Sequence, residues 1–120
     1  MKNLAFILGL TLITFLFAQT PQKMRYQAVL RNESGQILAN RQVGLKICIV
    51  QTEDSETVVY CETHKLTTND KGAISIEIGT GTRLVGTFSG VEWAKGSYFI
   101  QTETDANGGT NYVFNERVSL

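Results

Sequence analysis

The stretch that decides the fold is 43-VGLKICIV-50. Its aliphatic side chains occupy alternate positions, at Leu45, Ile47 and Ile49. Lys46 and Cys48 stand between them. Successive side chains of a β-strand point to opposite faces of a sheet, so this alternation predicts a strand with one face in a hydrophobic core.

Similar short stretches recur along the chain, separated by clusters of Asn, Asp, Gly and Ser that favour turns. The expected extended segments are residues 26–31, 37–38, 57–66, 73–78, 84–85, 87–88, 97–104 and 111–120. The turn at residues 69–72 is expected to join two paired strands, and residues 90–96 have room for one helical turn. No segment carries the apolar 3.6-residue period of a longer helix.

Strands separated by turns at intervals of about ten residues predict an all-β fold, an antiparallel β-sandwich of about seven strands over residues 25–120. The expected core consists of Val29, Leu45, Ile47, Ile49, Val58, Tyr60, Ile74, Ile76, Ile78, Trp93, Phe99 and Val113. We expect Trp93 to lie in this core or to cover its edge, because large aromatic side chains bury most of their surface.

The N-terminus has the pattern of a secretory signal peptide, residues 1–18. A short positive start, Met1-Lys2-Asn3, precedes an apolar run over residues 4–17 and the small residue Ala18. A membrane span takes about 20 apolar residues, so this run is too short for one. No cysteine lies near the end of the run to carry a lipid. Cleavage predicts a protein that is secreted or held at the cell surface, with residues 19–24 as an extended leader.

Charge limits the classes of partner. The chain has 11 basic and 11 acidic residues, so removal of Lys2 with the signal peptide leaves a single acidic residue in excess. A nucleic-acid-binding surface needs a concentration of Lys and Arg against the phosphates, which this composition lacks. We therefore expect no nucleic-acid partner, and no membrane span after signal cleavage.

Several motifs together resemble a module of secreted, Bacteroidota-type surface proteins. They are residues 26–29 (YQAV), 31–40 (RNESGQILAN), 43–45 (VGL), 62–64 (ETH), 78–81 (IGTG), 86–89 (GTFS), Trp93 and 108–112 (GGTNY). The resemblance runs from about residue 22 to residue 120. It implies an Ig-like (prealbumin-like) β-sandwich near the N-terminus of a longer exported protein. Partners would then be other domains of that protein or a cell-surface molecule.

Cys48 and Cys61 are the two cysteines of the chain. In an exported protein they predict a disulfide. A tight turn centred on Asp54-Ser55 would place them opposite each other, both on the outer face, at a distance that a disulfide can bridge. A wider loop, or strands in different sheets, would separate them. Two unrelated thiols or an intermolecular bond are the alternatives.

The single histidine, His64, does not complete a reactive centre. It lies three residues after Cys61 on an expected strand, so the two side chains point to opposite faces and form neither a catalytic pair nor a zinc site. Glu62 and His64 share a face. The turns at residues 69–70 and 105–107 each offer one carboxylate, too few for calcium, and residues 79–82 lack the Lys of a phosphate loop.

Two functions are compatible with these residues. The first is a non-catalytic exported module that acts as a structural, spacer or docking domain. The second is an adhesion module that binds a glycan or a protein through exposed aromatic side chains, with Trp93, Tyr98 and Tyr112 as candidates. Since no acid–base or metal cluster can be assembled from the sequence, we expect no enzymatic activity and no cofactor.

Overall fold

A long hairpin forms the centre of the fold. The computed structural model describes residues 23–120, so the predicted signal peptide and most of the predicted leader lie outside the described residues. Strand β2 (Gln42–Gln51) contains the alternating stretch and pairs antiparallel with β3 (Thr57–Thr67). The side chains of Leu45, Ile47 and Ile49 are fully buried, as their alternation predicts.

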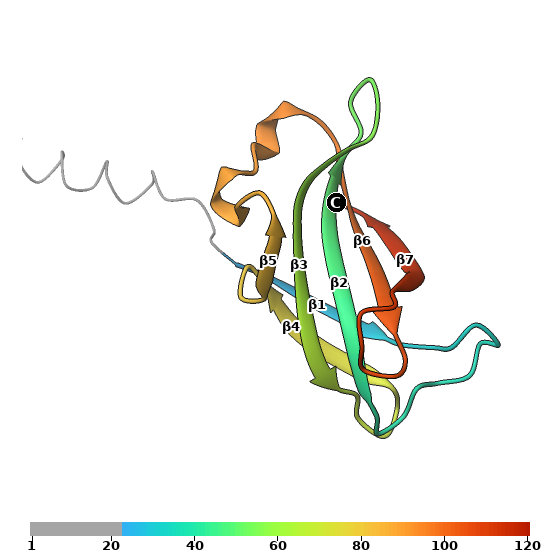
Figure 1. Ribbon diagram of the computed structural model, residues 1–120. Coiled ribbons are helices and arrows are strands. Elements are labelled where there is room, and N and C mark those ends of the chain that lie inside the picture. Colours follow the sequence, from blue (N-terminus) through green and yellow to red (C-terminus); the bar gives the residue numbers. More distant parts are fainter. Residues whose placement is uncertain (1–22) are drawn as a thin grey trace, which may run out of the picture.

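Three more strands extend this hairpin into a five-stranded antiparallel sheet. Strand β6 (Tyr98–Asp105) pairs with β2, and β7 (Val113–Ser119) pairs with β6. On the other side the short strand β5 (Thr82–Val85) pairs with β3. The order of the sheet is β5-β3-β2-β6-β7, and Figure 1 shows it face on.

A second sheet lies behind the first one. It consists of β1 (Met24–Val29) and β4 (Ala73–Ile78), which pair antiparallel and cross behind the five-stranded sheet (Figure 1). The predicted antiparallel β-sandwich of about seven strands is therefore confirmed. Strand β1 begins one residue before the predicted domain boundary at residue 25.

Aliphatic side chains fill the space between the sheets. Ile74 and Ile78 of β4 are buried, and Ile76 is packed against the same cluster. Burying an aliphatic side chain of this size contributes about 1.5–3 kcal/mol to the free energy of folding. At one end, two 3₁₀ turns, η1 (Phe88–Gly90) and η2 (Trp93–Lys95), close the core. The second lies within the predicted helical turn.

Four residues of the expected core face outward or lie at an edge instead. On β1 it is Tyr26 and Ala28 that face the core, so Val29 points to the opposite face and is exposed. Phe99 lies between the buried residues Tyr98 and Ile100 and therefore faces outward. Val113 begins the edge strand β7 and is exposed.

The fourth is Val58, and a β-bulge explains its position. Ile49 pairs with Tyr60, but the next residue of β2, Val50, pairs with Val58, so Val59 is the extra residue. An extra residue reverses the alternation of a strand beyond the bulge. Val58 therefore lies beside Val50 on the outer face, where it is 48% exposed, and not beside Tyr60 in the core.

The turn at residues 69–72 does not join two paired strands. It carries the chain from β3 in the large sheet to β4 in the small one, which pairs with β1. The Asn69 side-chain oxygen accepts hydrogen bonds from the backbone N–H groups of Lys71 and Ala73, each at 2.9 Å. Asn, Asp and Gly support a tight turn in either setting, so the local signal could not distinguish a hairpin from a crossover between sheets.

Candidate functional site

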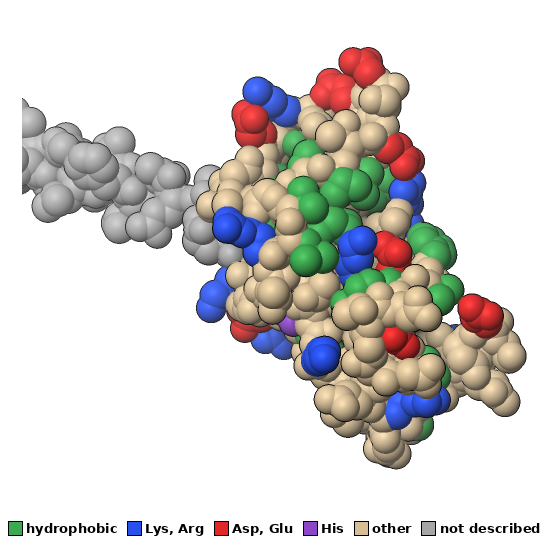
Figure 2. Space-filling model, in the orientation of Figure 1, with side chains coloured by type: hydrophobic (Ala, Val, Ile, Leu, Met, Phe, Trp, Pro, Cys, Tyr) green, Lys and Arg blue, Asp and Glu red, His purple; other side chains and the backbone are tan. Residues whose placement is uncertain are grey.

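The outer face of the five-stranded sheet carries a group of apolar side chains, which we call the outer patch. Its members are Cys48, Val50, Val58, Cys61, Val85 and Phe99. Cys48, Val50 and Cys61 are buried in it, although among residues 23–120 the two-stranded sheet lies on the opposite side. Val58 and Val85 are 48% and 43% exposed. Figure 2 shows apolar side chains gathered in the middle of this face.

A disulfide joins the two central strands under the outer patch. Cys48 and Cys61 are directly opposed in the β2–β3 register and are bonded, with a Cα–Cα distance of 4.1 Å. The predicted pairing is confirmed. Of the two connections considered, the wider one is present, since residues 52–56 lie between the strands. The bulge at Val59 compensates for the wider loop, so the cysteines still face each other.

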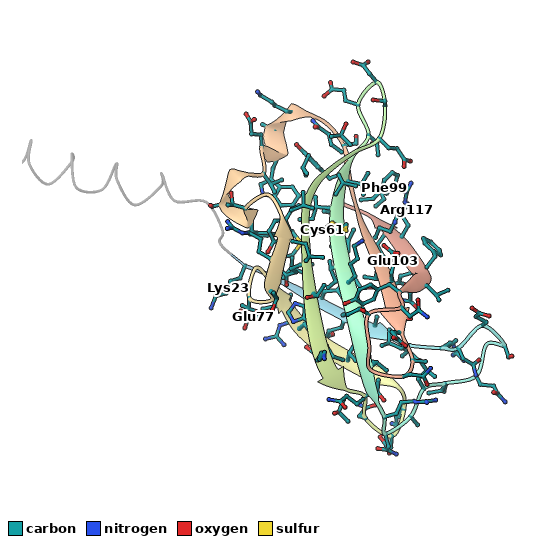
Figure 3. The ribbon with its side chains drawn as sticks, in the orientation of Figure 1. Lys23, Cys61, Glu77, Phe99, Glu103 and Arg117 are labelled. Atoms are coloured by element: carbon teal, nitrogen blue, oxygen red, sulfur yellow. A yellow bond between two sulfur atoms is a disulfide. The ribbon has the colours of Figure 1, made fainter. Side chains whose placement is uncertain are left out.

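Arg117 covers one border of the outer patch. Its guanidinium lies 4.9 Å from the centre of the Phe99 ring and donates two hydrogen bonds to the Glu56 carboxylate, at 2.7 and 3.0 Å. Figure 3 shows Phe99 and Arg117 close together near β7. A planar guanidinium can stack on an aromatic ring while its edge binds a carboxylate. The contact therefore ties the 52–56 loop to the edge strand.

The most unusual polar group in the core is Glu62 of β3, whose side chain is fully buried. Its carboxylate accepts hydrogen bonds from the Tyr60 hydroxyl at 2.5 Å and from the backbone N–H groups of Gly79 and Gly81 at 2.6 and 3.2 Å. It also contacts the Nε2 atom of His64. A buried carboxylate is stabilised only when its oxygens are hydrogen-bonded, and here both are.

This network accounts for the lowered pKa of Glu62, for the glycine-containing turn at residues 79–82 and for the position of His64. Burial by itself would raise the pKa of the Glu62 carboxyl, but the hydrogen bonds from His64, Tyr60 and Gly79 lower that pKa below its ordinary value. The glycine-containing turn at residues 79–82 thus donates its N–H groups to an anion, and the anion is a carboxylate of the same chain. His64 contacts this carboxylate and lies on the face opposite the disulfide, as its spacing from Cys61 predicts.

The three candidate aromatic residues lie in different environments. Tyr98 is buried in the core and its hydroxyl donates a hydrogen bond to the Glu92 carbonyl, so it cannot form part of an exposed platform. Alternation along β6 places it on the inner face with Ile100. Trp93 is half-buried, with its ring 5.9 Å from that of Phe88 and 5.1 Å from that of Tyr98. It covers the edge of the core, as expected.

Tyr112 is the aromatic candidate that borders a surface groove. The groove has a volume of about 480 Å³ and lies on the outer face of the sheet, beyond the outer patch. Residues of β3, of the turn before β5 and of the 106–112 loop line it, among them Thr63, Lys65, Thr82, Thr110 and Tyr112. The outer face is thus divided into an apolar half around the disulfide and a polar half around Tyr112.

The turn at residues 105–107 uses its carboxylate to hold the backbone, whereas the turn at residues 69–70 uses the amide oxygen of Asn69. Asp105 accepts hydrogen bonds from the N–H groups of Asn107 and Asn111, at 2.9 and 3.0 Å, and these bonds lower the pKa of its carboxyl. Among residues 23–120 no three His, Cys, Asp or Glu side chains converge as a metal-binding group would require.

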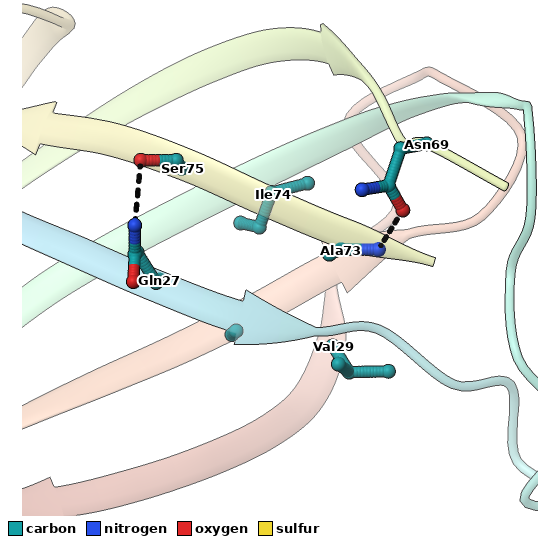
Figure 4. Close-up of a pocket in the computed structure, with 7 residues that line it drawn as sticks. Gln27, Val29, Asn69, Ala73, Ile74 and Ser75 are labelled. Atoms are coloured by element: carbon teal, nitrogen blue, oxygen red, sulfur yellow. Dashed lines mark hydrogen bonds between the residues drawn. The ribbon is translucent and has the colours of Figure 1, made fainter. Parts of the chain in front are cut away.

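A shallow hollow of about 470 Å³ lies over the two-stranded sheet (Figure 4). Apolar and small polar residues line it, including Val29, Ala73 and Ser75, and Gln27 donates a hydrogen bond to Ser75 across the two strands at 3.4 Å. Without a charged group or a free hydrogen-bonding cluster among these residues, the hollow offers no specific chemistry.

The outer patch and the Glu62 network were missed at the sequence level. A signal for the network exists, because Tyr60, Glu62 and His64 occupy alternate positions and therefore share one face. Burial of that face places the Glu62 carboxylate in the core, where its oxygens need hydrogen-bond donors. No comparable signal predicts the outer patch, since no local sequence pattern indicates the bulge that turns Val58 outward.

Comparison with protein families places the chain. A family described as a domain of unknown function (DUF8740) matches residues 25–117. No curated protein and no solved structure matches the chain. In the part of the chain that the structure describes, no helix is both long and apolar enough to cross a membrane. The matched region covers β1 to β7 except for the first residue of β1 and the last two residues of β7, and the chain belongs to the DUF8740 family.

Proposed function

We propose that this protein is a non-catalytic, exported β-sandwich module that acts as a structural, spacer or docking domain of a secreted or cell-surface protein. The observation that carries the docking role is the outer patch. Val58 and Val85 expose apolar surface on a sheet whose central strands are held together by a disulfide. Apolar side chains gathered on one rigid face favour contact with another protein surface.

Two further observations support the location. The Cys48–Cys61 disulfide is typical of proteins in oxidising compartments outside the cytoplasm. The sequence of residues 1–18 has the order of a cleaved signal peptide. The resemblance to secreted surface modules agrees with both. A secreted protein should therefore begin at Gln19, which intact-mass measurement of the exported material tests.

The non-catalytic role is supported by the environment of His64. Its Nε2 atom contacts a buried carboxylate that already binds a tyrosine hydroxyl and two backbone N–H groups. A general base must reach a nucleophile or a substrate proton. Here the histidine and the carboxylate hold the turn before β5 against β3.

Site-specific photo-crosslinking in the cells that export the protein tests the docking role. A photoreactive phenylalanine analogue is placed at position 58 or 85 in the outer patch, and at position 27 or 75 on the opposite sheet as matched controls. All four positions are exposed. We expect adducts of one defined mass from positions 58 and 85 and none from the controls. Equal yields from all four positions, or no adduct from either patch position, would contradict the proposal.

A further inference from the structure

The polar half of the outer face contains a groove built by two distant parts of the chain. Thr63 and Lys65 come from β3, and Thr82 begins β5, where it pairs with Thr63. Thr110 and Tyr112 belong to the loop between β6 and β7. The groove thus exists only because this loop lies over the sheet rather than extending away from it.

A glycine and an aspartate fix the loop in that position. Gly44 of β2 pairs with Lys65, and a Cβ atom at Gly44 would lie 2.1 Å from the carbonyl oxygen of Gly109. The absence of a side chain at Gly44 therefore lets the loop backbone rest directly on the strand. The Asp105 carboxylate binds the N–H groups of Asn107 and Asn111 and holds the loop in shape.

Two side chains of the groove lining are already engaged: His64 contacts the Glu62 carboxylate, and the Thr80 hydroxyl donates a hydrogen bond to the Glu77 carbonyl. The other lining side chains, those of Thr63, Lys65, Thr82, Thr110 and Tyr112, form no hydrogen bond or ion pair with any residue among 23–120. Each threonine hydroxyl can donate one hydrogen bond and accept two, and the Lys65 ammonium can donate three. The Tyr112 ring adds an apolar surface with a hydroxyl at its tip.

This combination matches a carbohydrate better than other ligand classes. A pyranose has an apolar C–H face that can lie on an aromatic ring, and hydroxyl groups around its rim that exchange hydrogen bonds with hydroxyl side chains. A phosphorylated ligand would call for several cationic side chains, whereas the lining includes one lysine, no arginine and one histidine whose Nε2 atom is already held by Glu62. An apolar peptide would call for an apolar lining. The volume of about 480 Å³ is in the usual range of ligand pockets.

We infer that the groove between β3 and the 106–112 loop binds a neutral oligosaccharide, with the Tyr112 ring against a sugar face and Thr63, Thr82 and Lys65 bonded to its hydroxyls. The inference does not depend on docking through the outer patch, which lies on the other half of the sheet. A failure of either proposal leaves the other intact.

Amide chemical-shift titration of the ¹⁵N-labelled protein tests the inference. The probes are trisaccharides of glucose, mannose, xylose and N-acetylglucosamine, each added separately. We expect at least one probe to shift the amides of Thr63, Lys65, Thr82 and Thr110 in a saturable way. Tyr112→Ala should weaken that binding at least tenfold, and Thr82→Val should weaken it while preserving side-chain volume.

Phe114→Ala is the matched control, because Phe114 is a 60% exposed aromatic residue that does not line the groove. It should bind the same trisaccharide as tightly as the unaltered protein. Thermal melting of each variant verifies that it is folded. The inference is overturned if no trisaccharide shifts the groove amides, if the shifts lie elsewhere, or if folded Tyr112→Ala binds normally.

Discussion

Tyr26 of β1 and Glu116 of β7 join the two sheets, because the tyrosine hydroxyl donates a hydrogen bond to the glutamate carboxylate across a sequence separation of 90 residues. Burial and this bond raise the pKa of the Tyr26 hydroxyl, so it remains a donor at all physiological pH values. The Glu62 carboxylate forms a comparable connection on the other side of the sandwich, where it binds the turn between β4 and β5. A glutamate carboxylate thus links separate parts of the sandwich in both places, through the Tyr26 hydroxyl in one and through two backbone N–H groups in the other.

Removing the Tyr26 hydroxyl should loosen the contact between the sheets. We expect Tyr26→Phe to lower the free energy of unfolding by about 2 kcal/mol, a typical value for a hydrogen bond to a charged group. Urea unfolding measures the change. Tyr112→Phe is the control, because the Tyr112 hydroxyl bonds to no residue among 23–120, and its stability should match that of the unaltered protein. Equal effects in the two variants would contradict the role of the bond.

The Glu62 network should make stability depend on pH in acid. The pKa of this carboxyl is lowered in the folded protein from an ordinary value of 4.5, so as the pH falls the unfolded chain binds a proton first. Stability contributed by the ionised carboxylate is therefore complete above about pH 5 and is lost as the pH falls through the lower folded-state pKa. We expect unfolding free energies measured from pH 7 to pH 3 to decline over this range.

Glu62→Gln should reduce that decline, because glutamine does not titrate, and should cost about 3 kcal/mol at pH 7, as expected when a buried, hydrogen-bonded charge is removed. Part of the acid dependence should remain, since the pKa values of the Asp105 and Glu56 carboxyls are lowered as well. Glu33→Gln, in an exposed turn, is the control. If the unfolding free energy of Glu62→Gln declined with pH as that of the unaltered protein does, Glu62 would not be a source of the acid dependence.

Reduction of the disulfide should destabilise the protein without changing its fold. The two cysteines are 13 residues apart. Removing a cross-link that closes a loop of this size costs about 3 kcal/mol of stability, because the unfolded chain regains conformational freedom. Thermal melting with and without dithiothreitol measures the loss, and a thiol assay verifies that reduction has occurred. The Cys48→Ser/Cys61→Ser variant should melt at the same temperature in both conditions. An unchanged melting temperature of the fully reduced protein would contradict the prediction.

Two glycines with positive φ should respond differently to the same substitution. Gly35 has φ +83° and open space around it, whereas at Gly72, with φ +73°, a Cβ atom would lie 2.3 Å from Cγ2 of Ile37. The left-handed conformation costs an alanine about 1 kcal/mol at either position. Gly72→Ala should exceed that cost because Ile37 must also move. Chemical denaturation of the Gly35→Ala and Gly72→Ala variants measures the two losses of unfolding free energy. Equal losses would rule out the steric contribution at Gly72.

The sequence by itself determined most of the secondary structure. The positions of β2, β4 and β6 follow from the alternation of apolar residues, since a strand exposes alternate side chains to a core wherever it lies in the fold. That of β3 follows from its β-branched and aromatic residues. The opposed positions of Cys48 and Cys61 were also predicted from one hairpin, although the register depends on a wider loop and a bulge that offset each other. The shared face of Glu62 and His64 was predicted as well, since it depends on the strand period alone.

Only the tertiary structure decided which strands share a sheet and which surfaces stay open. The turn at residues 69–72 has the same local chemistry whether it joins paired strands or crosses between sheets, and long-range pairing with β1 selects the crossover. The exposure of Val58 depends on a bulge, and the groove beside Tyr112 depends on a loop resting on Gly44, 65 residues before Gly109 in the chain. Such contacts are set by packing between distant segments, which local periodicity does not record.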